Sequence, residues 1–380
     1  MFAENKFVTG TRVIPADATH IHLVGVGGIG VSALAPILLH RGYTVSGSDP
    51  ARNEVTERLR RLGVRIHHQH RAENIEGASL IVVSSAIARD NPERLAAERM
   101  GVPVWRRAEM LGCFLEPLRG IVVTGAHGKT TVTAMITLAL VEGGIDPTAL
   151  VGGDVEFLGG NARVGAGEWI VAEGDESDGS FLCLRPEIAV VNNIDRDHLD
   201  FYPGLEEITL AFQRFLQGVR EGGWILLSAD CDAARRLTMP ERASRLTYGF
   251  HPSASLQARN YHADEEGISF DVFEMVQGKE FNADSPHDAI FAIQMDHPND
   301  NQERLNLGGE YGFKKTLFLR LGGKIGYDEE SISGGFGLNF QVMGSYWLQF
   351  DYAYSHMGRI TEATSDFAGQ PHRFSLGFLW

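Results

Sequence analysis

The chain has 380 residues, of which 43% are hydrophobic and 22% charged, as in a globular protein with more than one domain. This composition excludes wholesale disorder, collagen-like repeats and a coiled coil. The formal net charge of −15 argues against a non-specific nucleic-acid binder, because phosphate binding needs a basic surface. Three widely spaced cysteines favour a reducing compartment, and neither an export signal nor a membrane-spanning run is evident. We therefore expect a cytoplasmic protein without stable membrane insertion.

Up to residue 273, short apolar runs alternate with helix-length amphipathic segments. The pattern predicts strands at Ile21–Val26, Thr44–Ser48, Leu80–Ser84, Gly120–Thr124, Ile170–Glu173, Ile188–Asn192 and Trp224–Ser228. It predicts helices at Ile29–Arg41, Glu54–Leu62, Lys129–Glu142 and Leu205–Val219. This alternation is typical of an α/β fold with parallel sheets and helices on their faces. Because the pattern restarts near Gly120, we expect two domains, residues 1–115 and 116–273.

The first glycine-rich loop, Gly25-Val26-Gly27-Gly28-Ile29-Gly30, follows a predicted strand and opens a predicted helix. Such a loop lets the backbone approach a diphosphate, which the helix N-terminus then binds through its N–H groups. Asp49 ends the next strand, where an acidic residue can reach a ribose hydroxyl. The motif alone fits a nicotinamide dinucleotide, a UDP-sugar or a tight strand–helix turn without a ligand.

The second glycine-rich loop runs from Thr124 to Thr131 with the sequence TGAHGKTT. Its backbone N–H groups would surround phosphates, Lys129 would reach the β- and γ-phosphate oxygens, and Thr130 would bind Mg²⁺. The loop is shorter than the usual Walker A motif, because Val123 stands where that motif has its first glycine. Before Lys279 the chain has only one other lysine, Lys6, which makes a plain turn at Lys129 improbable.

Carboxylates and a histidine follow two later strands. Glu173 and the run EGDESD follow one apolar strand, and the run NNIDRDHLD with His198 follows the next. Ligands in open α/β sheets bind at the carboxyl ends of strands, and Mg²⁺ prefers oxygen ligands such as carboxylates and phosphates. The alternative is a set of solvated loop carboxylates. We favour a metal and phosphate site because the acidic residues cluster after buried strands.

In order along the chain, these motifs resemble the Mur ligase family. The likeness rests on VGVGGIGVSALA, Ser84-Ser85-Ala86-Ile87, TGAHGKTT, EGDESDGSF and NNIDRDHLD, and covers about residues 18–273. It implies a Rossmann-like UDP-sugar domain followed by a P-loop central domain of the Mur ligase type. It also implies ATP-dependent ligation of L-alanine to UDP-N-acetylmuramate through an acyl phosphate, with ATP and Mg²⁺ at the second loop.

The resemblance also assigns roles to residues. The implied catalytic residues are Lys129, Glu173 and His198, and the implied Mg²⁺ ligands are Thr130, Glu173 and His198. The ATP phosphates would be bound by Gly125, Ala126, His127, Gly128, Lys129, Thr130 and Thr131. The sugar nucleotide would be bound by Gly25, Gly27, Gly28, Ile29, Gly30, Asp49, His70 and Ser85.

The sequence after residue 273 does not continue the family pattern. Residues 274–288 form a junction, and residues 289–380 are expected to form an antiparallel β meander with strands at Leu317–Leu321, Phe336–Val342, Trp347–Tyr354 and Arg373–Trp380. This stretch resembles the closing strands of the PorV-type outer-membrane barrel family, although four or five strands cannot close a membrane barrel. An ordinary soluble meander packed on the first part is the competing interpretation.

The expected enzyme is therefore incomplete. The central domain is truncated, and the family's amino-acid-binding domain is not visible. One alternative is a protein that binds a nucleotide sugar and ATP without turnover, fused to an outer-membrane fragment. A nicotinamide-dependent oxidoreductase rests on the first glycine loop alone, and the second loop argues against it. An outer-membrane component is opposed by the lack of an export signal.

Overall fold

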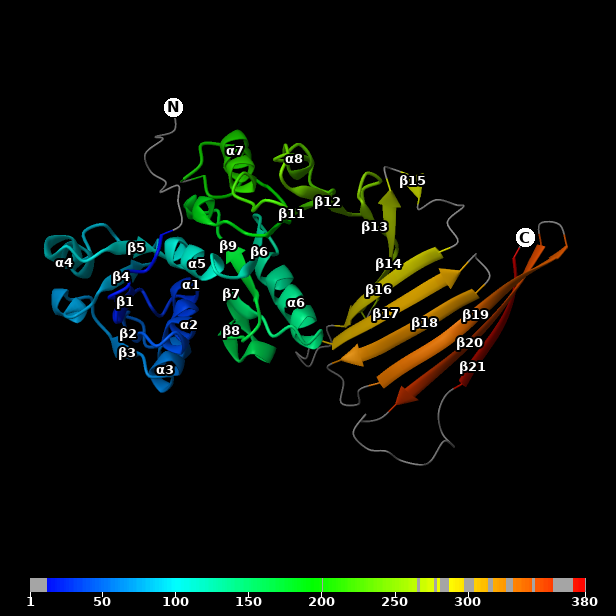
Figure 1. Cartoon of the computed structure of the whole chain (residues 1–380), viewed down its shortest axis with the longest axis horizontal. Helices are drawn as coiled ribbons and strands as arrows, with labels where there is room; N and C mark the ends of the chain where they lie inside the picture. The colour runs from blue at the N-terminus through cyan, green and yellow to red at the C-terminus, as the bar shows by residue number, and fades with distance from the viewer. Residues whose placement is uncertain are drawn as a thin grey trace. The chain divides into compact units, whose positions relative to one another are not determined.

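A computed structural model describes most of the chain (Figure 1). The described residues are 12–199, 201–264, 267–276, 279–280, 287–296, 304–313, 317–325, 331–343, 346–357 and 372–379. The chain divides into two compact units, Met1–Leu246 and Thr247–Trp380. None of the helices in the described part combines the length and the apolar character needed to cross a membrane.

The first unit begins with a five-stranded parallel sheet in the order β3-β2-β1-β4-β5. Its strands are β1 (His20–Val24), β2 (Thr44–Ser48), β3 (Arg65–His67), β4 (Leu80–Val83) and β5 (Val104–Arg106). Its helices are α1 (Ile29–Ser32), α2 (Leu34–His40), α3 (Glu54–Arg61), η1 (Ala72–Ile75), α4 (Pro92–Met100) and α5 (Arg107–Leu115). Because β1 is central and its neighbours β2 and β4 are reached by separate connections, the loops after β1 and β4 border the point where the strand order reverses.

The part of the second sheet that belongs to this unit continues from β12 (Ser244–Gly249) in the order β11-β10-β6-β9-β7-β8. Its strands are β6 (Arg119–Thr124), β7 (Thr148–Val155), β8 (Gly160–Arg163), β9 (Trp169–Gly174), β10 (Ile188–Val191) and β11 (Trp224–Ser228). The helical elements between and after these strands are α6 (Lys129–Glu142), η2 (Glu156–Leu158), η3 (Ser180–Cys183), α7 (Leu205–Leu216) and α8 (Asp232–Arg235). Strand β6 is parallel to its neighbours β9 and β10, so the loops after these three strands meet at one edge.

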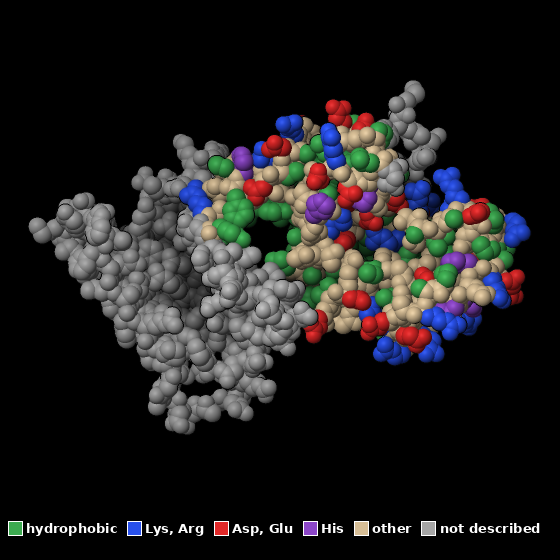
Figure 2. Space-filling model, turned by 180° about the vertical axis from the view of Figure 1, so that it is seen from behind, with side chains coloured by type: hydrophobic (Ala, Val, Ile, Leu, Met, Phe, Trp, Pro, Cys, Tyr) green, Lys and Arg blue, Asp and Glu red, His purple; other side chains and the backbone are tan. Residues whose placement is uncertain are grey.

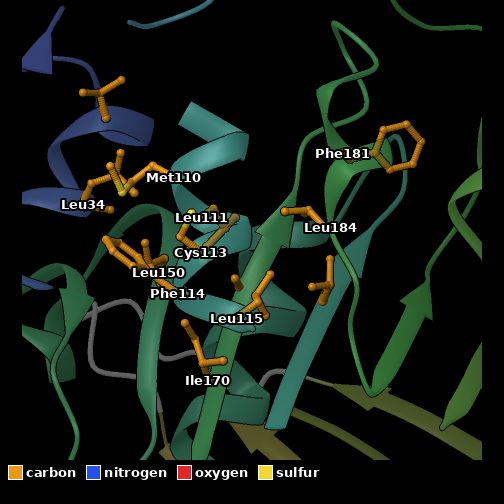
Figure 3. Packing of buried hydrophobic residues seen from close by; sticks show 14 of the residues in the cluster. Leu34, Met110, Leu111, Cys113, Phe114, Leu115, Leu150, Ile170, Phe181 and Leu184 are labelled. Atoms are coloured by element: carbon orange, nitrogen blue, oxygen red, sulfur yellow. The ribbon is translucent and has the colours of Figure 1, made fainter. Parts of the chain in front are cut away.

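The two sheets of the first unit share one hydrophobic core. The core includes Leu34 from α2, Phe114 from α5, Leu150 from β7 and Ile170 from β9 (Figure 3). Helix α5 is buried along most of its length, so it contributes side chains that contact both groups of elements. Burial of this shared apolar surface stabilises the first unit as a single body. On the face shown in Figure 2, acidic and basic side chains are intermingled.

The strands and helices that the sequence predicted in this unit are present, whereas β3, β5, β7, β8 and α5 were not predicted. The structure confirms the strands Thr44–Ser48 and Trp224–Ser228 and the helix Lys129–Glu142 at their predicted bounds. The helix predicted at Ile29–Arg41 is divided at Ala33, whose φ of −62° and ψ of −22° remain near-helical. Mixed α/β architecture with parallel sheets is thus the fold of the first unit.

Helix α4 was not predicted, although its sequence carries clear end signals. The Asn91 side chain accepts hydrogen bonds from the backbone at Glu93 and Arg94, and Pro92 occupies the first turn. Gly101 ends the helix with φ of 72°, a conformation that glycine adopts without strain. The apolar periodicity between these signals is weak, which explains why a search for amphipathic segments misses the helix.

The second unit consists of strands. Strand β12 (Ser244–Gly249) spans the boundary between the units, and β13 (Leu256–Asp264), β14 (Gly267–Val276) and β15 (Lys279–Glu280) follow. The remaining strands are β16 (His287–Asp296), β17 (Arg304–Phe313), β18 (Leu317–Ile325), β19 (Ser331–Met343), β20 (Tyr346–Met357) and β21 (His372–Leu379). From β16 to β21 each strand pairs antiparallel with the next. The four strands predicted here fall within β18 to β21, except that Trp380 lies outside the described residues.

Candidate functional site

The first glycine-rich loop joins β1 to α1 and is tied closely to the end of β2. The backbone N–H groups of Gly25 and Val26 donate to the Ser48 carbonyl at 2.8 and 3.2 Å. Gly25 has φ of +81°, and a Cβ atom on Gly27 would lie 2.8 Å from Cγ of Asp49. Only glycine therefore fits this tight loop without displacing its neighbours.

The other residues assigned to the sugar nucleotide surround this loop. The Asp49 carboxylate accepts hydrogen bonds from the Gly27 and Ala51 N–H groups, both at 2.8 Å, so it is engaged by the backbone here. His70 contacts the Ser48 side chain at 2.9 Å. Ser85 is exposed in the turn after β4. It follows Ser84, whose Cβ atom would lie 3.1 Å from a Cβ atom on Gly25. The first loop, the end of β2 and His70 after β3 are thus joined by hydrogen bonds.

The second glycine-rich loop joins β6 to α6 and is clamped by the segment after β10. Asn193 accepts hydrogen bonds from Ala126 N (3.2 Å) and His127 N (2.8 Å). Two of the N–H groups expected to face phosphates are therefore bonded within the protein. Gly128 has φ of +77° and precedes the first turn of α6, whose N–H groups and dipole suit an anion.

Lys129 lies at the start of α6, where its ammonium group is held by an acidic partner. Lys129 Nζ lies 2.9 Å from Glu176 Oε1 and donates to the Gly125 carbonyl at 2.6 Å. His198, which has an unusual φ of +54°, places Nε2 at 3.5 Å from the same Glu176 oxygen. Burial raises the pKa of Glu176, although Lys129 opposes the rise. The second oxygen of Glu176, Oε2, is buried and has no hydrogen-bond partner among the described residues.

Glu173 and Thr130 form the neighbouring part of this site. The Gly152 N–H group donates to Glu173 Oε1, and the Thr130 hydroxyl also bonds this carboxylate. Burial nevertheless raises the pKa of Glu173 above its ordinary value. A cation beside such a carboxylate would stabilise its charged form, so the donor set suits Mg²⁺.

The donor set is incomplete for a metal ion bound by protein groups alone. No group of three His, Cys, Asp or Glu side chains in the described part of the chain is arranged to hold a metal ion. Magnesium commonly takes one or two carboxylates together with phosphate oxygens and water. The residues Thr130 and Glu173 therefore suit an ion that arrives with a nucleotide, whereas His198 contacts the Glu176 oxygen that Lys129 already bonds.

Arg107 is a residue that the sequence analysis did not single out. It starts α5, and a Cβ atom on Gly30 of the first loop would lie 2.9 Å from its Cδ. Its guanidinium nitrogen Nη2 lies 3.8 Å from Asp175 Oδ2, in the acidic run after β9. Burial would raise the pKa of Asp175, but bonds from Ser177 and the charges of Arg107 and Lys129 lower it overall. The positively charged guanidinium group of Arg107 thus lies between the first glycine-rich loop and the acidic run after β9.

Glu176 and Asn193 were also missed as individual residues. Both lie inside the runs EGDESDGSF and NNIDRDHLD, so the signal was present but did not say which side chain faces the loop. Their contacts with the second loop join residues 47 and 66 positions apart in sequence.

Comparison with known proteins agrees with this arrangement. Residues 20–119 match the model of the Mur ligase family catalytic domain, and residues 123–291 match the Mur ligase middle domain. This chain belongs to the Mur ligase family through residues 20–291. The second Mur ligase match runs past residue 273, where the sequence motifs end.

Relatives with assigned names are similar over the same part of the chain. A UDP-N-acetylmuramate–L-alanine ligase of Desulfosudis oleivorans is 48% identical over 67% of this chain and 56% of the relative. The ligase of that name from Syntrophus aciditrophicus is 47% identical over 69% of this chain and 55% of the relative. The crystal structure of the UDP-N-acetylmuramate–alanine ligase of Thermotoga maritima superposes with a TM-score of 0.61 at 30% identity, over 69% of this chain and 59% of that one.

The Mur ligase similarity has a clear limit. The chain spans about half the length of the curated relatives that it matches. The comparisons give no support to the likeness between residues 289–380 and an outer-membrane protein family, which stays a prediction from the sequence.

Proposed function

We propose that this chain supplies the sugar-nucleotide and ATP sites of a ligase that joins L-alanine to UDP-N-acetylmuramate in peptidoglycan precursor synthesis. The single observation that carries the proposal is the ion pair between Lys129, at the end of the second glycine-rich loop, and Glu176. Thr130 and Glu173 lie beside this pair and bond each other. Such a set of one cation, one hydroxyl and two carboxylates suits a nucleoside triphosphate with Mg²⁺. Two relatives with this named activity share nearly half their aligned residues with the chain.

In this proposal residues 1–115 bind the sugar nucleotide. The loop Gly25–Gly30 and the N-terminus of α1 would contact its diphosphate, because a tight glycine turn at a helix start is suited to anions. His70 follows β3 and Ser85 follows β4 in the same sheet, and both would contact the rest of the ligand. Asp49 would act through the loop that its carboxylate holds in shape.

Residues 116–273 would bind ATP, which supplies the phosphoryl group that activates the substrate carboxylate as an acyl phosphate. Lys129 would leave Glu176 and bind phosphate oxygens, since a phosphate offers the ammonium group a second anionic partner. Thr130 and Glu173 would hold Mg²⁺, and His198 with Glu176 would orient a second cation or the reacting carboxylate. Because the reaction consumes ATP, the proposal places it in the cytoplasm.

A second candidate function is binding without turnover. The matched part of the chain spans about half the length of the curated relatives. Residues 292–380, beyond the second family match, would then be an appended strand region. This chain would recognise UDP-N-acetylmuramate and Mg-ATP without completing the ligation.

Phosphate release by the purified full-length chain tests the proposal. We expect release to require Mg-ATP, UDP-N-acetylmuramate and L-alanine together if the chain is active. Binding of both nucleotides without release would support the second candidate. The absence of binding for UDP-N-acetylmuramate and Mg-ATP alike would contradict both functions.

A matched variant pair shows that release belongs to this site. Lys129→Ala removes the ammonium group at the second loop, whereas Lys6→Ala removes a lysine far away in sequence from either loop. Only the first change should abolish release. Equal activity of the two variants would assign the release to a contaminating ATPase.

A further inference from the structure

A buried carboxylate lies beneath the first glycine-rich loop. Glu93, in the first turn of α4, is 0% exposed. Its Oε2 accepts a hydrogen bond from the Ser48 hydroxyl at 2.6 Å, and its Oε1 accepts one from Asn74 Nδ2 at 2.6 Å. His22 Nε2, also fully buried, lies 3.4 Å from Oε1. An isolated buried carboxylate would be very costly, so this set of donors allows the charge to be buried.

The same carboxylate faces a histidine near the loop. His70 Nδ1 lies 2.8 Å from Glu93 Oε2 and 2.9 Å from the Ser48 hydroxyl. The backbone carbonyl of Ser48 accepts the N–H groups of Gly25 and Val26. One residue, Ser48, therefore connects the buried charge, the histidine and the candidate diphosphate loop.

The protonation state of Glu93 decides the hydrogen position on His70. Burial by itself would raise the pKa of Glu93, but the close contact with His22 and the hydrogen bonds from Ser48 and Asn74 outweigh it and lower the pKa to about 2. At neutral pH both Glu93 oxygens can only accept hydrogen bonds. The nitrogen that faces them, His70 Nδ1, must then carry a hydrogen, and in the Nδ1–H tautomer Nε2 is the acceptor.

The other nitrogen of His70 is available to a ligand. His70 is 19% exposed at its side chain, and Nε2 has no hydrogen-bond partner within the described residues. Nε2 is not one of the buried polar atoms without a partner, so it is accessible to solvent. A ring fixed on one side and open on the other is suited to hydrogen-bonding a ligand.

We propose that Glu93 is a positioning residue that holds His70 in the Nδ1–H tautomer, so that Nε2 accepts a hydrogen bond from an N–H or O–H group of a uridine nucleotide. This inference rests on the proposed function, which places the sugar nucleotide at the first loop. Glu93 itself does not touch the ligand. It acts through His70, as a carboxylate orients an imidazole behind a metal or a nucleophile.

The tautomer can be measured directly in the full-length chain labelled with ¹⁵N-histidine. The ¹⁵N resonances of a protonated and an unprotonated ring nitrogen are well separated, and the spectrum of His70→Gln identifies the signals of His70. We expect Nδ1 to be protonated and Nε2 unprotonated, with the Nε2 resonance shifting on addition of UDP. A wild-type His70 with its hydrogen on Nε2 overturns the proposal without any variant at Glu93.

Glu93→Gln then tests the link to binding, with Glu98→Gln as its matched control. Glu98 lies on the same helix, but its side chain is 54% exposed. The glutamine at position 93 can offer an N–H group to His70 Nδ1, which would move the hydrogen to Nε2. We expect UDP-N-acetylmuramate to bind about tenfold more weakly, as for the loss of one hydrogen bond, with Mg-ATP binding unchanged. The control should change neither the tautomer nor either affinity.

The outcomes separate this inference from the proposed function. If Glu93→Gln changes the tautomer and leaves UDP-N-acetylmuramate binding intact, the positioning role is wrong. An equal loss of UDP-N-acetylmuramate and Mg-ATP binding would indicate a structural role for Glu93 and would also overturn it. A wild-type chain that binds no UDP-N-acetylmuramate contradicts the proposed function, whereas a chain that binds it with the Nε2–H tautomer contradicts only the role of Glu93.

Discussion

The buried charge of Glu93 should make the stability of the first unit depend on pH. The side chain is fully buried, and its hydrogen bonds lower its pKa from the ordinary value of 4.5 to about 2. A carboxylate with a lowered pKa stabilises the folded state above its ordinary pKa, and this contribution is lost as the pH falls through the folded value. The window for Glu93 therefore lies between about pH 4.5 and about pH 2.

The magnitude follows from the size of the pKa difference. A decrease of about 2.5 units, at about 1.4 kcal/mol per unit, corresponds to about 3 kcal/mol at neutral pH. The same relation leaves about 1 kcal/mol at pH 3, one unit above the folded pKa. Glu93→Gln keeps the size of the side chain but cannot carry the charge, so it should lose this pH-dependent part.

Urea unfolding of the wild type and of Glu93→Gln at pH 7 and pH 3 measures the effect. Tryptophan fluorescence is a suitable signal, because Trp105 in β5 is only 4% exposed within the same sheet. We expect the difference in unfolding free energy to shrink from about 3 to about 1 kcal/mol between the two pH values. Glu98→Gln should change the free energy by less than about 0.5 kcal/mol at both. A difference that stays constant with pH would refute the reasoning.

Three other perturbations test the site and the core. Lys129→Ala should lower ATP-dependent phosphate release by roughly a hundredfold or more while UDP-N-acetylmuramate binding stays nearly intact; equal loss of both ligands, measured by equilibrium dialysis, would contradict the assignment of separate sites. Arg107→Ala should raise the pKa of Asp175 by removing one of the charges that lower it, and an unchanged titration of that carboxyl by NMR would argue against their coupling. Phe181→Ala removes a fully buried ring and should destabilise the first unit by about 3–5 kcal/mol in urea unfolding, whereas a loss below about 1 kcal/mol would mean that the core does not depend on it.

The reactivity of the Cys183 thiol tests how well this part of the first unit is buried. Burial raises the pKa of Cys183 to about 12, so almost none of it is a thiolate at pH 8. We expect its alkylation by iodoacetamide to be far slower than that of a free cysteine peptide, followed by mass spectrometry. Rapid modification of the native chain would show that this part of the core opens readily.

Local sequence patterns determined much of this protein. The spacing of the glycines located both loops. Gly25 and Gly128 have φ in the left-handed region, which favours glycine whatever the surrounding fold. Apolar periodicity located the strands and helices on either side, and it gave several of their bounds to the residue. The acidic runs after β9 and β10 were found for the same reason, because they directly follow buried strands in the chain. These features depend on neighbours within a few residues, so they can be read without the fold.

The tertiary structure alone decided which side chains meet. The sequence could not show that Lys129 pairs with Glu176, that Asp49 bonds the backbone of Gly27, or that Glu93 lies behind His70. Each pair joins residues from different connections, and their meeting depends on the order of strands in the two sheets. A run such as EGDESD offers four acidic side chains at one strand end, and only packing selects the one that faces the phosphate loop. The chemistry of the site was therefore present in the sequence, while its geometry came from the long-range pairing of the strands that carry it.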